Sequence, residues 1–102
     1  MIARLWKTGL KAGRSTAYEA FARDISLPMF RQQDGFLGCV MSRREDECLV
    51  LTFWRDEAAV EALKRSAAYQ ATVERILAAG LLAGAQSTEV TDVHLLALDR
   101  LS

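Results

Sequence analysis

The only histidine of this chain, His94, is the side chain best suited to acid–base chemistry. With an ordinary pKa of about 6.5, it could act as a general base near neutrality and take a proton from a phenol or an acidic carbon. It lies in the apolar stretch VTDVHLLAL, where strand alternation leaves open whether it points inward. A histidine that faces solvent or forms a hydrogen bond at a dimer edge is the structural alternative.

Four further side chains could shape a binding site. Trp54 and Trp6 could each donate an indole N–H to a substrate oxygen while the ring forms an apolar wall. Tyr69 could offer a phenolic hydroxyl from a helix. Arg4 shares a strand face with Trp6 and would need a partner or a ligand anion if it were buried. The structural alternatives are core or interface aromatics for the tryptophans, a packed helix residue for Tyr69 and an exposed cation for Arg4.

Other kinds of site have little support in the sequence. In a hairpin that turns near Glu45 and Asp46, Cys39 and Cys48 would lie about 13 Å apart, which is too far for a disulfide. Two free thiols are typical of a reducing compartment. A metal site on these cysteines is weakly indicated, because His94 is the only histidine. We expect no metal and no bound cofactor.

The composition narrows the class of protein. The chain has 102 residues, of which 51% are apolar, and its thirteen basic and thirteen acidic residues cancel. No basic stripe is available for nucleic acid, no apolar run is long enough to span a bilayer, and no signal peptide is visible. We therefore expect one cytoplasmic domain over residues 1–102, with its core between about residues 2 and 98, and no nucleic-acid or membrane partner.

Four segments are expected to be strands, because they combine apolar content with turn signals at their ends. Together with two helices they follow the order βαββαβ, which predicts a ferredoxin-like α+β fold with a four-stranded antiparallel sheet. The predicted strands span residues 2–8, 36–43, 48–55 and 90–98.

Both predicted helices have start signals. Thr16 with Glu19 forms a capping-box pattern for the first helix. Pro28 is expected to kink or restart that helix, because it lacks an N–H. Asp56 is the expected N-cap of the second helix, and Ser66 marks a possible break before the helix ends at the segment 80–84.

Both faces of the third predicted strand carry apolar or small side chains. Leu49, Leu51 and Phe53 point one way, and the intervening side chains, which are also apolar or small, point the other way. Two helices can cover only one face of the sheet. We therefore expect the other face to pack on a second copy of the chain about a two-fold axis, forming a homodimer. A monomeric sheet with scattered exposed apolar residues is the alternative.

Several segments, in this order and spacing, resemble the antibiotic biosynthesis monooxygenase (ABM) domain of the dimeric α+β-barrel superfamily. The resemblance runs from Ile2 to about Leu98. It is carried by the segments MIARLWKT, DGFLGCVMSRRE and LVLTFWRDEAAVEAL and by the step from Ser66 to Tyr69.

The resemblance implies a pocket between sheet and helices in each protomer. It also implies oxygenation of electron-rich polyketide phenols without metal, flavin or haem, in which the substrate loses a proton and then reduces O₂. We therefore expect a cofactor-independent monooxygenase acting on a small aromatic or polyketide-like substrate. His94 would be the base, Trp54 and Tyr69 would assist catalysis, and Trp6, Arg4 and Trp54 would bind substrate. A non-catalytic dimeric module for a small ligand or a partner, and an isomerase or cyclase, are the alternatives.

The departures from the family pattern are also informative. Haem-degrading relatives use an asparagine, a tryptophan and a histidine where this chain has Trp6, Leu63 and Val73, so haem degradation is not expected. Polyketide oxygenases carry an asparagine and a tyrosine where this chain has Val50 and Val60. Of that set only the tryptophan is matched, by Trp54.

Overall fold

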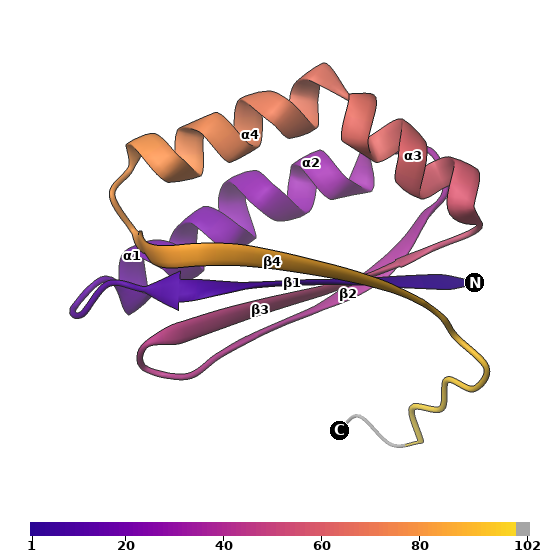
Figure 1. Ribbon diagram of the computed structural model, residues 1–102, viewed down its shortest axis with the longest axis horizontal. Coiled ribbons are helices and arrows are strands. Elements are labelled where there is room, and N and C mark those ends of the chain that lie inside the picture. Colours follow the sequence, from indigo (N-terminus) through magenta and orange to yellow (C-terminus); the bar gives the residue numbers. More distant parts are fainter. Residues whose placement is uncertain (100–102) are drawn as a thin grey trace.

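The computed structural model describes residues 1–99, which form a four-stranded antiparallel sheet with all the helices on one of its faces (Figure 1). This arrangement confirms the predicted ferredoxin-like α+β fold. The strand order is β2-β3-β1-β4. The elements are β1 (Ile2–Leu10), α1 (Ser15–Phe21), the π-helical turn η1 (Ala22–Ser26), α2 (Leu27–Arg31), β2 (Phe36–Arg43), β3 (Glu47–Trp54), α3 (Glu57–Arg65), α4 (Ala67–Ala78) and β4 (Leu82–Asp92).

The strand register decides which side chains face the helices. Every second residue of β3, from Cys48 to Trp54, is buried. Arg4 pairs with Thr52 and Trp6 with Val50, so both side chains of β1 lie on this helix-covered face. Cys48 lies opposite Arg43, as the hairpin prediction requires, and both cysteines are free.

The apolar core fills the space between the sheet and the helices in two adjoining clusters, with Trp6 and Met41 packed against both. The first cluster comprises Ile2, Met29, Phe30, Val50, Trp54, Ala59, Val60 and Leu63, and the second comprises Leu10, Tyr18, Phe21, Ala22, Cys48, Ile76 and Leu81.

The first helix begins differently from the prediction. The capping box of Thr16 and Glu19 does not form; α1 starts at Ser15, and no side chain caps it. Gly13, with φ +76°, turns the chain, and Arg14 becomes the N-cap residue. Thr16 is therefore already inside the helix, where its side chain cannot serve as a cap. The restart at Pro28 is confirmed, because Pro28 lies in the first turn of α2, where a missing N–H costs little.

The second helical region agrees with the prediction. Asp56 caps α3 by accepting a hydrogen bond from the backbone N–H of Ala59 at 2.9 Å. Ser66 interrupts the helix with an extended backbone, and its hydroxyl accepts from the N–H of Tyr69 at 3.2 Å. This break starts α4 in a new direction and places Tyr69 in its first turn. Within residues 1–99, no helix is long and apolar enough to cross a membrane.

The predicted last strand is wrong. The strand is Leu82–Asp92 rather than residues 90–98, so His94 lies beyond its end. β4 pairs with β1 from Ile2 opposite Asp92 to Leu10 opposite Leu82. Most of its side chains are exposed, so the strand is held by backbone pairing at the sheet edge and carries no apolar pattern that would reveal it.

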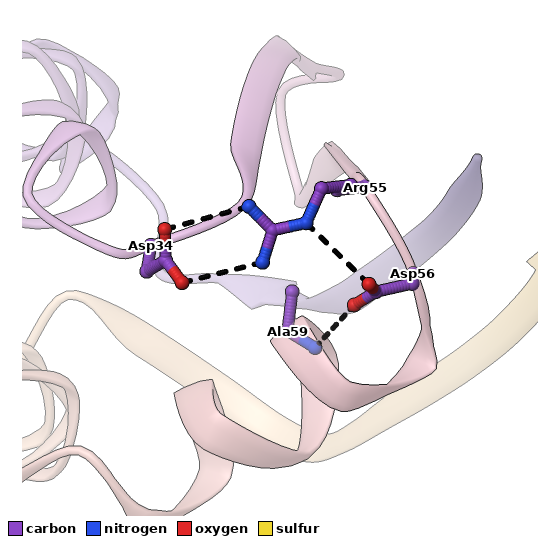
Figure 2. Close-up of polar contacts among 4 residues, drawn as sticks. All are labelled: Asp34, Arg55, Asp56 and Ala59. Atoms are coloured by element: carbon purple, nitrogen blue, oxygen red, sulfur yellow. Dashed lines mark hydrogen bonds and ion pairs between the residues drawn. The ribbon is translucent and has the colours of Figure 1, made fainter.

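The junction of β3 and α3 is tied to the loop before β2 (Figure 2). The guanidinium of Arg55 donates to the carboxylate of Asp34 at 3.2 and 3.4 Å and to Asp56 at 3.4 Å. The hydrogen bonds and the positive charge of Arg55 hold the pKa of Asp34 below its usual value. These groups are exposed, so they contribute to loop geometry more than to stability.

Candidate functional site

A small cavity lies between the helix-covered face of the sheet and the helices, with a volume of about 50 Å³. Its wall is mostly apolar. The sheet forms one side of the cavity, and α1, η1, α2 and α4 form the other. The apolar lining residues are Ala22, Met29, Phe30, Met41, Val50, Val73 and Ile76. A cavity of this size holds a few water molecules. Drug-sized ligands occupy about 300 Å³ or more, so a ligand here must be small or must displace flexible side chains such as Met29 and Met41.

One buried cation faces the cavity. Arg4 is 6% exposed and lies on the inner strand β1. Its Nη2 donates a hydrogen bond of 2.7 Å to the hydroxyl of Tyr69. Its guanidinium carbon lies 5.3 Å from the centre of the Tyr69 ring, which adds a cation–π contact. Its Nε is buried and has no hydrogen-bond partner among the described residues.

The remaining polar lining groups are neutral. The indole N–H of Trp6 donates to the side-chain oxygen of Gln86 at 3.0 Å, which joins β1 to β4 across the cavity wall. Burial, with Cys48 beside it, raises the pKa of Tyr18 well above its usual value. The Tyr18 hydroxyl therefore stays protonated near neutrality and cannot act as a base. Ser26 and Thr72 add hydroxyl groups to the lining.

The sequence pattern of the antibiotic biosynthesis monooxygenase family matches residues 1–75, which is most of the chain. The chain belongs to the ABM family. This confirms the family inferred from the order of its sequence segments.

Solved structures agree with the ABM fold. A protein of unknown function from Nitrosomonas europaea, NE2512, is similar with a TM-score of 0.77 at 20% identity, covering 97% of this chain and 94% of its own. SnoaB, a cofactor-independent oxygenase from Streptomyces nogalater, has a TM-score of 0.74 at 13% identity, covering 96% and 97%. Rv0793 from Mycobacterium tuberculosis has a TM-score of 0.67 at 19% identity, covering 99% and 98%. At these identities the likeness shows the fold alone. A search of curated proteins found no match.

Three of the five predicted site residues of this ABM protein meet at the cavity. Arg4 and Trp6 reach it from β1, and Tyr69 reaches it from α4. The predicted pairing of Trp6 with a substrate oxygen now has a competitor, because Gln86 already accepts its N–H.

Trp54 lies outside the cavity lining. It is fully buried in the core, and its N–H donates to the hydroxyl of Thr52 at 2.8 Å. The same hydroxyl lies 3.4 Å from the backbone oxygen of Arg4. Trp54 therefore supports, through Thr52, the strand that carries Arg4, and its role in substrate binding or catalysis stays a prediction.

His94 also lies outside the cavity lining. It is exposed, two residues beyond the end of β4. The structure of one chain does not bring it to Arg4 or Tyr69, and its role as a base stays a prediction. In the part of the chain that the structure describes, no cluster of three or more histidine, cysteine, aspartate or glutamate side chains could hold a metal ion.

Sequence reasoning missed Gln86 and the two methionines of the lining. Gln86 was missed because the last strand was placed too late in the chain. Met41 had a usable signal: the register places it opposite Val50, on the same sheet face as Trp6. Met29 follows Ala22 and Ile25 at helical spacing, which predicts an apolar helix face, but its position at a cavity depends on how the helix packs.

Proposed function

We propose that this ABM protein oxygenates a small aromatic or polyketide-like phenol in the cavity, without a bound cofactor. The observation that carries the proposal is the Arg4–Tyr69 pair, which places a hydrogen-bonded positive charge in a mostly apolar wall. An apolar wall suits an aromatic ring. A preorganised cation in such a site stabilises negative charge that develops on a substrate oxygen.

The reaction we propose needs no external reductant. A substrate with a CH₂ group beside its phenolic rings loses a proton to give an enolate, which Arg4 stabilises. The enolate passes one electron to O₂, and the resulting radical and superoxide combine to a peroxide. Loss of water leaves a carbonyl group, so the substrate supplies all four electrons that reduce O₂. The protein contributes orientation and a dry cavity. The proton passes either to solvent or to His94.

The direct test is O₂ consumption with an anthrone, which carries the CH₂ group that the proposed reaction oxidises to a carbonyl. We expect turnover by the wild type, and a loss of at least tenfold in Val73→Phe, because the larger side chain would fill the cavity. Leu77→Phe, on the exposed side of the same helix, is the matched control and should keep the wild-type rate. Binding of the phenol without O₂ consumption would favour the non-catalytic module, and turnover without O₂ would favour an isomerase or cyclase.

The role of His94 is tested in the same assay. A loss of most of the rate in His94→Ala would support it as the base. An unchanged rate would show that the proton leaves by another route, and the assignment of His94 would then be wrong.

We also propose that a second copy of the chain covers the sheet face opposite the helices, here called the open face. In Figure 1 all the helices lie on the other side of the sheet. The register places Leu5, Leu51 and Val40 in one row across the open face, with Leu49 and Phe53 beside them on β3. Val40 is 52% exposed. Burying such side chains contributes roughly 1.5–3 kcal/mol each.

Leu51→Glu is expected to convert a dimer to a monomer, because the charge would be buried at the centre of the open face. The dimer should weaken about a hundredfold or more. Light scattering at micromolar concentration measures the mass, and Leu77→Glu, on the outer side of α4, should remain dimeric. A wild-type mass equal to one chain would contradict the proposal.

A further inference from the structure

Arg4 is a buried cation without a counter-charge. The ion pairs of residues 1–99 involve Arg23, Arg43, Arg55 and Lys64, with partly exposed side chains. Arg4 takes part in none of them although it is only 6% exposed. A buried charge is costly unless it is paired. Tyr69, its only side-chain partner in the described chain, is a neutral phenol and leaves the positive charge uncompensated.

The guanidinium is held in place and keeps a buried donor, Nε, without a partner among residues 1–99. The Tyr69 hydroxyl accepts from Nη2 at 2.7 Å, and the centre of the Tyr69 ring lies 5.3 Å from the guanidinium carbon. On the neighbouring strand β3, the hydroxyl of Thr52 donates to the backbone oxygen of Arg4 at 3.4 Å. Nε, in contrast, is buried and has no acceptor in the described part of the chain. A donor that is fixed, charged and unpaired is ready for an anionic oxygen.

The rest of the cavity restricts what can carry that oxygen. No aspartate or glutamate is among the lining residues, and Tyr18 stays protonated. Most of the remaining lining is apolar and includes Phe30, Val50 and Val73. With a cavity of about 50 Å³ and two flexible methionines, the space favours a small aromatic body.

We propose that the ligand of this cavity is a small aromatic acid bound as its anion, with a carboxylate or phenolate oxygen accepting a hydrogen bond from Nε of Arg4. This deepens the proposed function and rests on the same site. It makes Arg4 the residue that selects anionic over neutral aromatics.

Calorimetric titration with benzoate and benzamide tests this selection, because the two probes have nearly the same shape and differ in charge. We expect the wild type to bind benzoate more tightly than benzamide. Arg4→Met should weaken benzoate binding about ten- to a hundredfold, and it should leave benzamide binding nearly unchanged. Arg4→Lys, which keeps the charge but loses the planar fork, should lie between them.

A second probe, 4-nitrophenol, reports the phenolate directly through its absorption. Bound to the wild type, its pKa should fall by about one unit or more, because a nearby cation favours the anion. The shift should vanish in Arg4→Met. A shift with 4-nitrophenol but no preference for benzoate would assign phenolates as the ligand class, and the reverse result would assign carboxylates; both support the proposal.

Equal affinity for benzoate and benzamide together with an unshifted 4-nitrophenol pKa would overturn the proposal. Thermal unfolding shows whether Arg4→Met folds; a methionine of similar length in place of an unpaired buried charge should keep the stability or raise it. None of these readouts depends on turnover. A protein that selects benzoate through Arg4 but never consumes O₂ would refute the oxygenase and leave this inference standing.

Discussion

Truncation of Trp54 to alanine is expected to lower the free energy of unfolding by about 3–5 kcal/mol, a loss typical of a large aromatic removed from a core. Trp54 is fully buried. Its ring packs edge-on against Phe36 at 5.5 Å and Phe30 at 6.3 Å between centroids. These contacts join the end of β3 to β2 and α2, so the neighbouring elements cannot collapse into the space without losing their own packing. Chemical denaturation with urea measures the loss.

A double-mutant cycle separates the hydrogen bond of Trp54 from its packing. Thr52→Val should cost about 1–3 kcal/mol, because it leaves the indole N–H buried without an acceptor. The further change Trp54→Phe removes that donor, so the double variant should lose less than the sum of the two single losses. Strict additivity would show that the hydrogen bond contributes nothing.

The same variants decide whether Trp54 also binds ligand. Because Trp54 is not among the cavity-lining residues, Trp54→Phe should change the stability and keep the benzoate affinity of the wild type. A tenfold loss of affinity in a variant of unchanged stability would instead support the substrate-binding role predicted from the sequence.

Gly35→Ala is the second change with a large expected effect, about 2–5 kcal/mol of destabilisation. Gly35 has φ +83°, which costs an L-residue free energy whatever surrounds it. A Cβ at this position would also come within 2.5 Å of the Cβ of Ala59 in α3. Ala59 belongs to the turn that Asp56 caps (Figure 2), so it cannot move away without disturbing the start of α3.

Gly13→Ala is the matched control for the backbone cost. Gly13 has a similar φ of +76° and nothing within 4 Å of the added Cβ. It should lose only about 1–2 kcal/mol, and the difference between the two variants measures the contact with Ala59. In an Ala59→Gly background, Gly35→Ala should cost only as much as Gly13→Ala, because the contact with the Ala59 Cβ is gone. Equal losses at Gly13 and Gly35 would show that the steric overlap is relieved without cost.

Local signals explain the parts of the fold that were predicted well. The cap at Asp56, the break at Ser66 and the restart at Pro28 each depend on a few neighbouring residues, and the structure confirms them. The last strand has no such signal. Its residues are mostly exposed, and its position depends on pairing with β1 across the sheet.

The candidate site divides in the same way. Alternation along β1 was enough to place Arg4 and Trp6 on one face, and Tyr69 was expected on the second helix, but its place in the first turn of α4 was seen only in the structure. For Arg4 the sequence supported only a conditional prediction: if buried, it would need a partner or a ligand anion. The structure shows that Arg4 is buried. The packing of α4 over β1 brings Tyr69 to it across 65 positions of the chain.

The sequence by itself thus determined the order of the elements, the family and the surplus of apolar strand surface, since these follow from periodicity and from short motifs. Only the tertiary structure decided that Arg4 is buried without a counter-charge and that Trp54 and His94 both lie outside the cavity lining. Burial and charge compensation depend on which residues distant in the chain come into contact, and local sequence patterns carry no information about those contacts until the elements pack.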